Sequence, residues 1–304
     1  MDEKLFKNLP IKEVYKDLLQ PGMRKIGSSL ETVFELSNSI LLPIKLLNER
    51  SRMIFDRNMK RYAEKLDNIP DDKLSQVPPY VGLPILDKLT YLSDETLAEI
   101  FINLLSKAST NETLNLVHPS YISTLNDLSK DEATILFEFN NQEDIPFIDI
   151  YLNKTVHSKK KPPNFDKKGP KSRDELKESI DYTFQDKQIV DIRAAWNLTG
   201  IEHFINLDFP ENIDIYINNL DRQNIIEFER SNYNLNQITI YEALEGEHYK
   251  KIIDGYREDA ISLESENDDG FTAFKLNVKR GRIQFTDYGR GFMNACLKEI
   301  KNNA

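Results

Sequence analysis

IGSSLETVFELSNSILLPIKLL, residues 26–47, contains no Lys or Arg before Lys45. Wound as a helix at about 100° per residue, it separates into a polar stripe and an apolar face. The polar stripe consists of Ser28, Glu31, Thr32, Glu35, Asn38 and Ser39. A helix of this length spans about 30 Å, the thickness of the hydrocarbon core of a bilayer. The pattern predicts an amphipathic helix that is long enough to cross a membrane and too polar along one side to do so alone.

Two interpretations of this helix remain open. In the first, its apolar face packs on the core of a soluble domain, which is the usual meaning of such a pattern. In the second, several copies assemble in a membrane with their polar stripes around water, because carboxylates within a membrane must face a bundle interior or a cavity. Glu31 and Glu35 would then line a pore and favour cations. The basic segment 49–65 follows directly, and such a segment holds its end of a helix on the cytoplasmic side.

Length, charge and cysteine content limit the classes of protein. The 304 residues suffice for two domains, and the net charge of −10 argues against nucleic-acid binding by the whole surface. The single cysteine, Cys296, excludes an internal disulfide and a cysteine zinc site and fits a reducing cytosol. The acidic start Met1-Asp2-Glu3 is unlike a signal peptide, and no run of eighteen apolar residues occurs. We therefore expect a cytoplasmic protein or one at the cell inner membrane.

Residues 1–140 have the apolar spacing of helices packed on helices. The helices expected here cover 5–19, 26–47, 50–66, 83–92, 94–108 and 130–139. Ser93 is the expected N-cap of the helix over 94–108. Ser129 with Glu132 forms a capping-box pattern before the helix over 130–139. We predict a helical first domain.

Residues 141–175 change to a basic, proline-containing composition. The lysines are concentrated in its second half, where the candidate contacts are Lys159, Lys160, Lys161, Lys167 and Lys168. A solvated linker is one interpretation. A contact for a phosphate backbone or an anionic lipid is the other.

Residues 176–304 predict an α+β second domain of the winged-helix type. Helices are expected over 191–198, 200–207 and 212–228, then strands over 271–278 and 283–286, and a last helix over 289–300. The turn between the strands would be the wing tip, with Lys279, Arg280 and Arg282 as candidate nucleic-acid contacts. The expected third helix is acidic, however, and winged helices also bind proteins, so a protein partner stays open.

No catalytic constellation is found in the sequence. The four histidines, at positions 118, 157, 203 and 248, lie far apart, and none has a second histidine or a carboxylate at metal-ligand spacing. Phosphate-loop and dinucleotide-binding fingerprints are lacking as well. We therefore expect a protein that is not an enzyme and has no metal or cofactor. Overall, the sequence predicts a mainly α fold with a smaller α+β part.

Several short motifs resemble the abortive infection alpha family of bacterial phage-defence proteins. They are, in chain order, Val14-Tyr15-x-Asp17-Leu18-Leu19-Gln20-Pro21, Ile26-Gly27, Leu42-Pro43-Ile44-Lys45-Leu46-Leu47, Leu104-Leu105-Ser106-Lys107-Ala108, Val117-His118-Pro119-Ser120-Tyr121, Leu128-Ser129-x-Asp131-Glu132-Ala133 and Thr286-Asp287-Tyr288-Gly289-Arg290-Gly291-Phe292-x-x-Ala295-Cys296. The resemblance covers about 12–140 and the last twenty residues, and leaves 145–270 uncovered. It implies defence by growth arrest or death, and it carries over no catalytic residue.

The pattern and the resemblance together favour a two-part effector. Its first part would be a homo-oligomeric membrane pore lined by residues 26–47. Its second domain and basic linker would bind a nucleic acid, or a regulatory partner encoded in the same operon, that holds the pore shut until infection. Two alternatives stay open: a soluble nucleic-acid-binding regulator in which 26–47 is core, and a toxin with an unrecognised nuclease activity.

Overall fold

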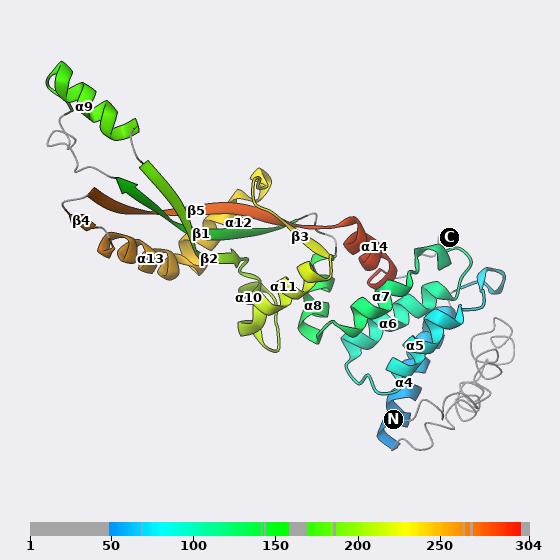
Figure 1. The fold of residues 1–304 in the computed structure, drawn as a ribbon. Helices are drawn as coiled ribbons and strands as arrows, with labels where there is room; N and C mark the ends of the chain where they lie inside the picture. Colours follow the sequence, from blue (N-terminus) through cyan, green and yellow to red (C-terminus); the bar gives the residue numbers. More distant parts are fainter. Residues whose placement is uncertain are drawn as a thin grey trace, which may run out of the picture. The chain divides into compact units, whose positions relative to one another are not determined.

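The computed structural model describes most of the chain from Glu49 onward (Figure 1). The described residues are 49–67, 69–140, 142, 144–157, 169–184, 187–263, 265–267 and 270–298. The predicted helix over 26–47 with its candidate pore-lining residues lies outside them, and so do the candidate contacts Lys159, Lys160, Lys161, Lys167 and Lys168. The chain forms two compact units. The helical unit comprises Met1–Asn141, Tyr216–Ile225 and Phe285–Ala304, and the sheet unit comprises Gln142–Ile215 and Ile226–Gln284.

The helical unit is built around helix α6. Its helices are α4 (Glu49–Asp67), α5 (Pro79–Leu89), α6 (Glu95–Ala108), α7 (Pro119–Asn126), α8 (Lys130–Phe139), the later part of α11 (Ile213–Arg222) and α14 (Asp287–Cys296), with short 3-10 turns η3 (Asp71–Lys73) and η4 (Leu114–Leu116). Helix α6 packs against α4, α5, α7, α8 and α14. It is buried on nearly all sides from Ile100 to Ala108, which fits an apolar sequence that packs on several neighbours.

Side chains that bind free backbone N–H groups fix where these helices begin. The predicted capping box of α8 is confirmed: the Ser129 hydroxyl accepts from the Glu132 N–H, and the Glu132 carboxylate accepts from the Ser129 N–H. For α6 the predicted N-cap Ser93 is wrong. The helix begins one residue later, and the Asp94 carboxylate accepts from the Leu97 N–H at 2.9 Å. An N-cap side chain accepts from the N–H two or three residues later, and Leu97 is the third residue after Asp94.

The sheet unit contains one sheet whose strands run in the order β2-β1-β5-β3. The strands are β1 (Asp144–His157), β2 (Lys187–Leu198), β3 (Ile226–Glu229), β4 (Ser265–Asn267) and β5 (Gly270–Phe285). Strand β1 pairs antiparallel with both β2 and β5, and β4 pairs with the start of β5. The remaining elements are α9 (Arg173–Phe184), α10 (Ile201–Phe204), η5 (Pro210–Asn212), η6 (Leu235–Gln237), α12 (Ile238–Ala243), the π-helix η7 (Leu244–His248) and α13 (Lys250–Ser262).

One face of the sheet carries the apolar core of this unit. Tyr241, Leu244, Tyr249 and Ile253, from α12, η7 and α13, form this core with Ile148 and Ile150 of β1. Successive residues of a strand point to opposite faces. The even-numbered residues of β1 from 148 to 152 therefore point to the core, and the odd-numbered ones point to the opposite face.

The structure confirms mixed helix and strand content and corrects three predicted elements. The predicted helix over 191–198 belongs to strand β2, and the predicted helix over 212–228 divides into α11 and β3. The division falls after Asn224, whose φ of 57° is left-handed and ends the helix.

The predicted hairpin with its wing tip is also wrong, because residues 279–282 lie inside the continuous strand β5. Gly281 does not make a turn. It pairs with Phe147 of β1, and a Cβ at this position would lie 2.3 Å from the Phe147 ring. The glycine is needed so that an aromatic ring can lie directly on the backbone of the neighbouring strand.

Within the described residues, none of the helices combines the length and the apolar character needed to cross a bilayer.

Candidate functional site

Two histidines from distant parts of the sequence stack on each other in the sheet unit. His203 belongs to α10 and His248 ends the π-helix η7. Their ring centroids lie 4.7 Å apart and their planes differ by 13°. The Phe204 ring meets His248 edge-on at 5.0 Å. A π-helical turn is rare and often accompanies a functional site, which makes this pair the first place to look for chemistry.

A carboxylate and a phenol complete the cluster around these rings. The Tyr249 hydroxyl donates to Glu202 Oε1 at 2.6 Å and accepts from the Gly200 N–H at 2.9 Å. Glu202 Oε1 lies 3.6 Å from His203 Nε2. Glu202 Oε2 is buried and has no hydrogen-bond partner among the described residues. The carboxylate is thus held at one oxygen and retains unused acceptor capacity at the other.

Negative charge shapes the electrostatics of the cluster. Burial raises the pKa of Tyr249 far above its ordinary value, and its hydrogen bond to Glu202 raises it further. Burial also raises the pKa of Asp214, with the charge of Glu202 acting in the same direction. Tyr249 therefore stays a neutral donor at any physiological pH, while Glu202 and Asp214 make the site favourable for a positive group.

This arrangement can carry acid–base chemistry. Imidazole is the side chain used most often as a general acid or base, and two imidazoles close together could serve as an acid and a base in one reaction. Glu202 lies beside His203 at ion-pair distance rather than at hydrogen-bond distance. No group of three His, Cys, Asp or Glu side chains that could hold a metal ion occurs among the residues that the structure describes.

The three basic residues predicted as nucleic-acid contacts are divided between the two faces of the sheet. Lys279 pairs with Asp191 at 3.2 Å on the face opposite the core. Arg280 and Arg282 point to the other face, where Arg280 Nε lies 2.6 Å from Glu245 and Arg282 Nη1 lies 3.4 Å from Asp144. Strand alternation separates neighbouring residues in this way. Their contact with nucleic acid stays a prediction, and Lys279 is the one best placed for it.

Asp149 is a buried carboxylate at the centre of a hydrogen-bond network that sequence reasoning missed. Its side chain accepts from Arg230 Nε at 3.0 Å and from the Asn197 N–H at 2.8 Å. Arg230 also donates to the Asn197 side-chain oxygen at 2.6 Å and lies over the ring of Phe228. The sequence signal for this network was the aspartate inside the apolar run IPFIDIYL. Such a run predicts a buried strand, and a buried carboxylate requires a partner.

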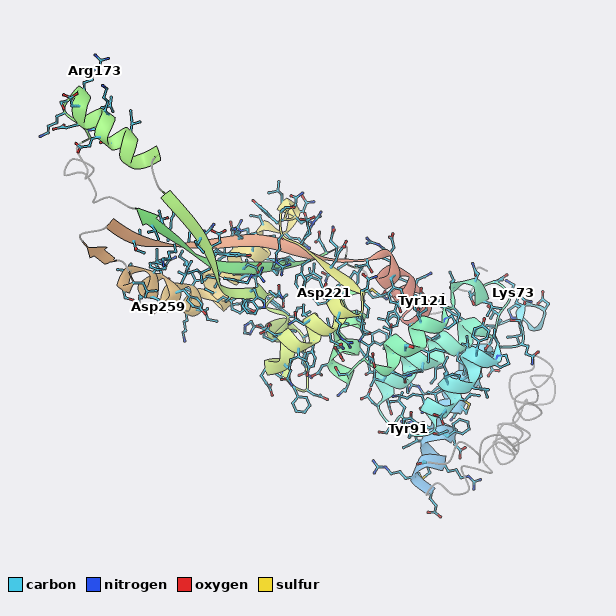
Figure 2. All side chains as sticks on the ribbon, viewed as in Figure 1. Lys73, Tyr91, Tyr121, Arg173, Asp221 and Asp259 are labelled. Atoms are coloured by element: carbon cyan, nitrogen blue, oxygen red, sulfur yellow. The ribbon has the colours of Figure 1, made fainter. Side chains whose placement is uncertain are left out.

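The described motifs of the family resemblance, from Leu104 to Ala133 and from Thr286 to Cys296, lie in the helical unit, where they provide packing. Lys107 donates from Nζ to the Asn294 carbonyl. The Tyr121 ring, labelled in Figure 2, packs edge-on against Tyr288 at 5.4 Å and Phe292 at 5.6 Å. These contacts join α6 and α7 to α14, so the motifs maintain the fold of this unit.

Comparison with known proteins gives one match. A family model described as abortive infection alpha matches residues 52–296. The match includes 145–270, which the motifs had left uncovered, and it begins after residues 26–47. The searches of curated proteins and of solved structures found no match.

Proposed function

We propose a function for this chain on the premise that it belongs to the abortive infection alpha family. Abortive infection is a defence in which an infected bacterial cell stops growing or dies before the phage multiplies. The family therefore suggests an anti-phage role. We propose that the chain is the effector of such a defence. The helical unit, to which residues 26–47 belong, causes the damage, and the sheet unit regulates it.

The insertion of one unit into the other carries this proposal. The helical unit is made of three separate segments of chain, and the sheet unit of the two segments between them. The chain passes from one unit to the other after residues 141, 215, 225 and 284. Because the sheet unit consists of two inserted segments, the chain connects it covalently to the helical unit at four points. A ligand that favours one conformation of the inserted unit can therefore bias the host as well.

The last of these connections leads straight into a core helix. Strand β5 ends at Phe285, and Thr286 then caps α14 by accepting from the Gly289 N–H at 2.9 Å. The Thr286 N–H donates to the Ile225 carbonyl at 3.1 Å, which fixes the start of α14. Helix α14 packs on α6, the centre of the helical unit. A conformational change of strand β5 would thus be transmitted to α14 and α6 through a few residues.

The damaging step that we propose is opening of the inner membrane. Residues 26–47 would line a homo-oligomeric pore, with Glu31 and Glu35 facing its water-filled interior. The support is the amphipathic pattern, the basic helix α4 that follows it, and the lack of a recognised catalytic motif in the family resemblance.

Membrane potential in cells that express the protein tests this step. The wild type is compared with Phe34→Asp combined with Leu41→Asp, which places charge on the apolar face. The matched control, Thr32→Asp with Ser39→Asp, adds the same charge to the polar stripe. We expect the wild type and the control to depolarise cells and to sediment with membranes, and the apolar-face variant to do neither. Growth arrest by the wild type at unchanged membrane potential would rule out the pore.

A second candidate function is RNA cleavage at the stacked histidines. A neutral imidazole takes the proton of a ribose 2′-OH, and the freed oxygen attacks the neighbouring phosphorus. The P–O5′ bond breaks, and the second, protonated imidazole gives its proton to the departing 5′ oxygen. The products are a 2′,3′-cyclic phosphate and a 5′-hydroxyl.

Total RNA from arrested cells tests this candidate. We compare the wild type with His203→Asn and His248→Asn, and use His118→Asn as control because His118 caps helix α7 instead. The candidate requires cleaved RNA with cyclic phosphate ends in the wild type and the control and intact RNA in the two variants. Intact RNA in all strains would exclude RNA cleavage as the function of the stacked histidines.

A further inference from the structure

The sheet face opposite the apolar core carries aromatic and cationic side chains from three strands. We call it the open face and define it by Tyr151, Arg193, Trp196, Lys275 and Lys279. The register places Tyr151 opposite Arg193 on β2 and opposite Asn277 on β5. Residues directly opposite each other in an antiparallel pair share a face. Lys275 and Lys279 share it too, because they pair with Asn153 and Asp149, the odd-numbered neighbours of Tyr151.

The aromatic rings and the cations of the open face are interleaved. The Arg193 guanidinium lies 5.9 Å from the Tyr151 ring and 5.7 Å from the Trp196 ring. The Lys279 ammonium lies 4.3 Å from the same Tyr151 ring. Trp196 is 46% exposed, which is high for the one tryptophan of the chain. An exposed tryptophan and a half-buried tyrosine thus lie among cations, and accessible rings bordered by cations are the arrangement on which nucleic-acid bases stack while phosphates contact the charges.

The charge of the open face is positive, although the protein is acidic as a whole. Arg193 and Lys275 have no acidic partner among the described residues. Lys279 pairs with Asp191, but both side chains are more than 40% exposed, and such pairs contribute little. Lys279 can therefore exchange this carboxylate for a phosphate. The open face is a local cationic patch of the kind that an acidic protein needs for such a contact.

Hydrogen bonds among Asp149, Arg230 and Asn197 hold together the strands that carry the open face. Asp149 and Arg230 neutralise each other beside the open face, and Asn197 ties both to the edge of β2. Asn197 has a left-handed φ of 55°, and the register of β1 with β2 shifts around Ile150. These bulges turn the end of β2 and place Trp196 beside Arg193. The strands that carry the open face are therefore held together before a ligand binds.

We infer that the open face binds single-stranded nucleic acid. Flat rings offer stacking to unpaired bases, which a duplex keeps inside its own stack, and the cations follow the backbone. The inference rests on the proposed function in that it supplies the ligand of the regulatory sheet unit. Binding to the isolated protein can be measured separately from toxicity.

Fluorescence anisotropy with the full-length protein tests this inference. The probes are labelled RNA and DNA strands of about 20 nucleotides and a duplex of the same sequence. The variant is Arg193→Gln with Trp196→Ala. The matched control is Lys88→Gln with Tyr91→Ala, because Lys88 lies over the exposed Tyr91 ring at 5.5 Å in the helical unit. Circular dichroism verifies that both variants fold.

We expect the wild type and the control to bind the single strands more tightly than the duplex. The open-face variant should bind about tenfold more weakly or worse. Between about 50 and 200 mM salt, the slope of log K against log salt should fall by about 0.7 for the lost cation. The inference is overturned by an absence of binding, by equal binding of the duplex, by an equal loss in the control, or by equally strong competition from polyglutamate. Absent binding together with intact depolarisation would overturn this inference alone and leave the proposed function standing.

Discussion

Lys107 shows how one residue of the family motifs serves the fold. It is 3% exposed on α6, and its ammonium donates to the Asn294 carbonyl in the last turn of α14. A cation at a helix C-terminus is favourable, but removal from water lowers the pKa of Lys107 to about 8. Its neighbour Cys296 is fully buried, and burial raises the pKa of that thiol far above its ordinary value. The cysteine is therefore an unreactive core residue.

The pKa of Lys107 predicts a pH dependence of stability. In the unfolded chain the lysine keeps its ordinary pKa of 10.5, so between about pH 8 and pH 10 the unfolded state binds more protons than the folded state. The free energy of unfolding therefore gains a contribution that rises by about 2 kcal/mol across this window. Below this window Lys107 is charged in both states, so the folded state carries the full free-energy cost of burying that charge.

Urea unfolding of the wild type and of Lys107→Met at several pH values measures this contribution as a difference. Other groups titrate alike in both proteins and cancel. The series stops at about pH 10 because burial raises the pKa of Tyr62 to about 12, so that at higher pH ionisation of the unfolded tyrosine lowers the stability of both proteins alike. A difference between the two proteins that stays constant with pH would show that Lys107 is not desolvated.

At the scale of elements, local signals predicted those features that depend on neighbouring residues. The helices α6 and α8 and the capping box of α8 follow from spacing and from residues three positions apart. The strand alternation of β5 was also visible, but the role of Gly281 was not. A glycine in a basic segment resembles a turn unless the ring of Phe147, far away in the sequence, is known to lie against it.

The candidate sites could not be predicted from the sequence either, because they too depend on contacts between residues that are far apart in the chain. Nothing in the spacing of His203 and His248 indicates that their rings stack, because α10 and η7 are separated in the sequence by α11, β3 and α12. The bulges of β2 break the alternation of its sequence, so residues 191–198 were mistaken for a helix. Contacts between distant segments carry the chemistry here, and a single sequence does not display them.

Close packing of α14 gives a prediction about one of its glycines. A Cβ on Gly289 would lie 1.9 Å from the backbone carbonyl oxygen of Ile225, which cannot move without displacing the chain. We expect Gly289→Ala to lower the free energy of unfolding by about 3 kcal/mol or more. Gly255→Ala in α13 is the control, because no atom lies within 4 Å of its Cβ, and alanine there should stabilise the helix by about 0.5 to 1 kcal/mol. Equal melting temperatures for wild type and Gly289→Ala would contradict the packing.

At the scale of the whole molecule, the family motifs and the candidate sites belong to different units. The quoted motifs from Leu104 to Ala133 and from Thr286 to Cys296 lie in the helical unit, where they join α6, α7, α8 and α14. The stacked histidines and the open face lie in the sheet unit. We infer that the helical unit provides the common framework and that the inserted sheet unit provides ligand recognition.

Two units with separate cores should lose their structure separately, and Asp149 tests this. Asp149→Ala removes a buried acceptor of the Asn197 N–H and the carboxylate partner of Arg230, whose side chain is 35% exposed, so we expect a loss of about 1 to 3 kcal/mol in the sheet unit. Hydrogen exchange followed by mass spectrometry should show faster exchange in β1, β2 and β5, with α6 and α14 unchanged. Asp191→Ala, which removes the exposed partner of Lys279, should change exchange little. Faster exchange of α6 together with the strands would mean that the chain unfolds as one cooperative unit, and the division into effector and regulator would then lose its physical basis.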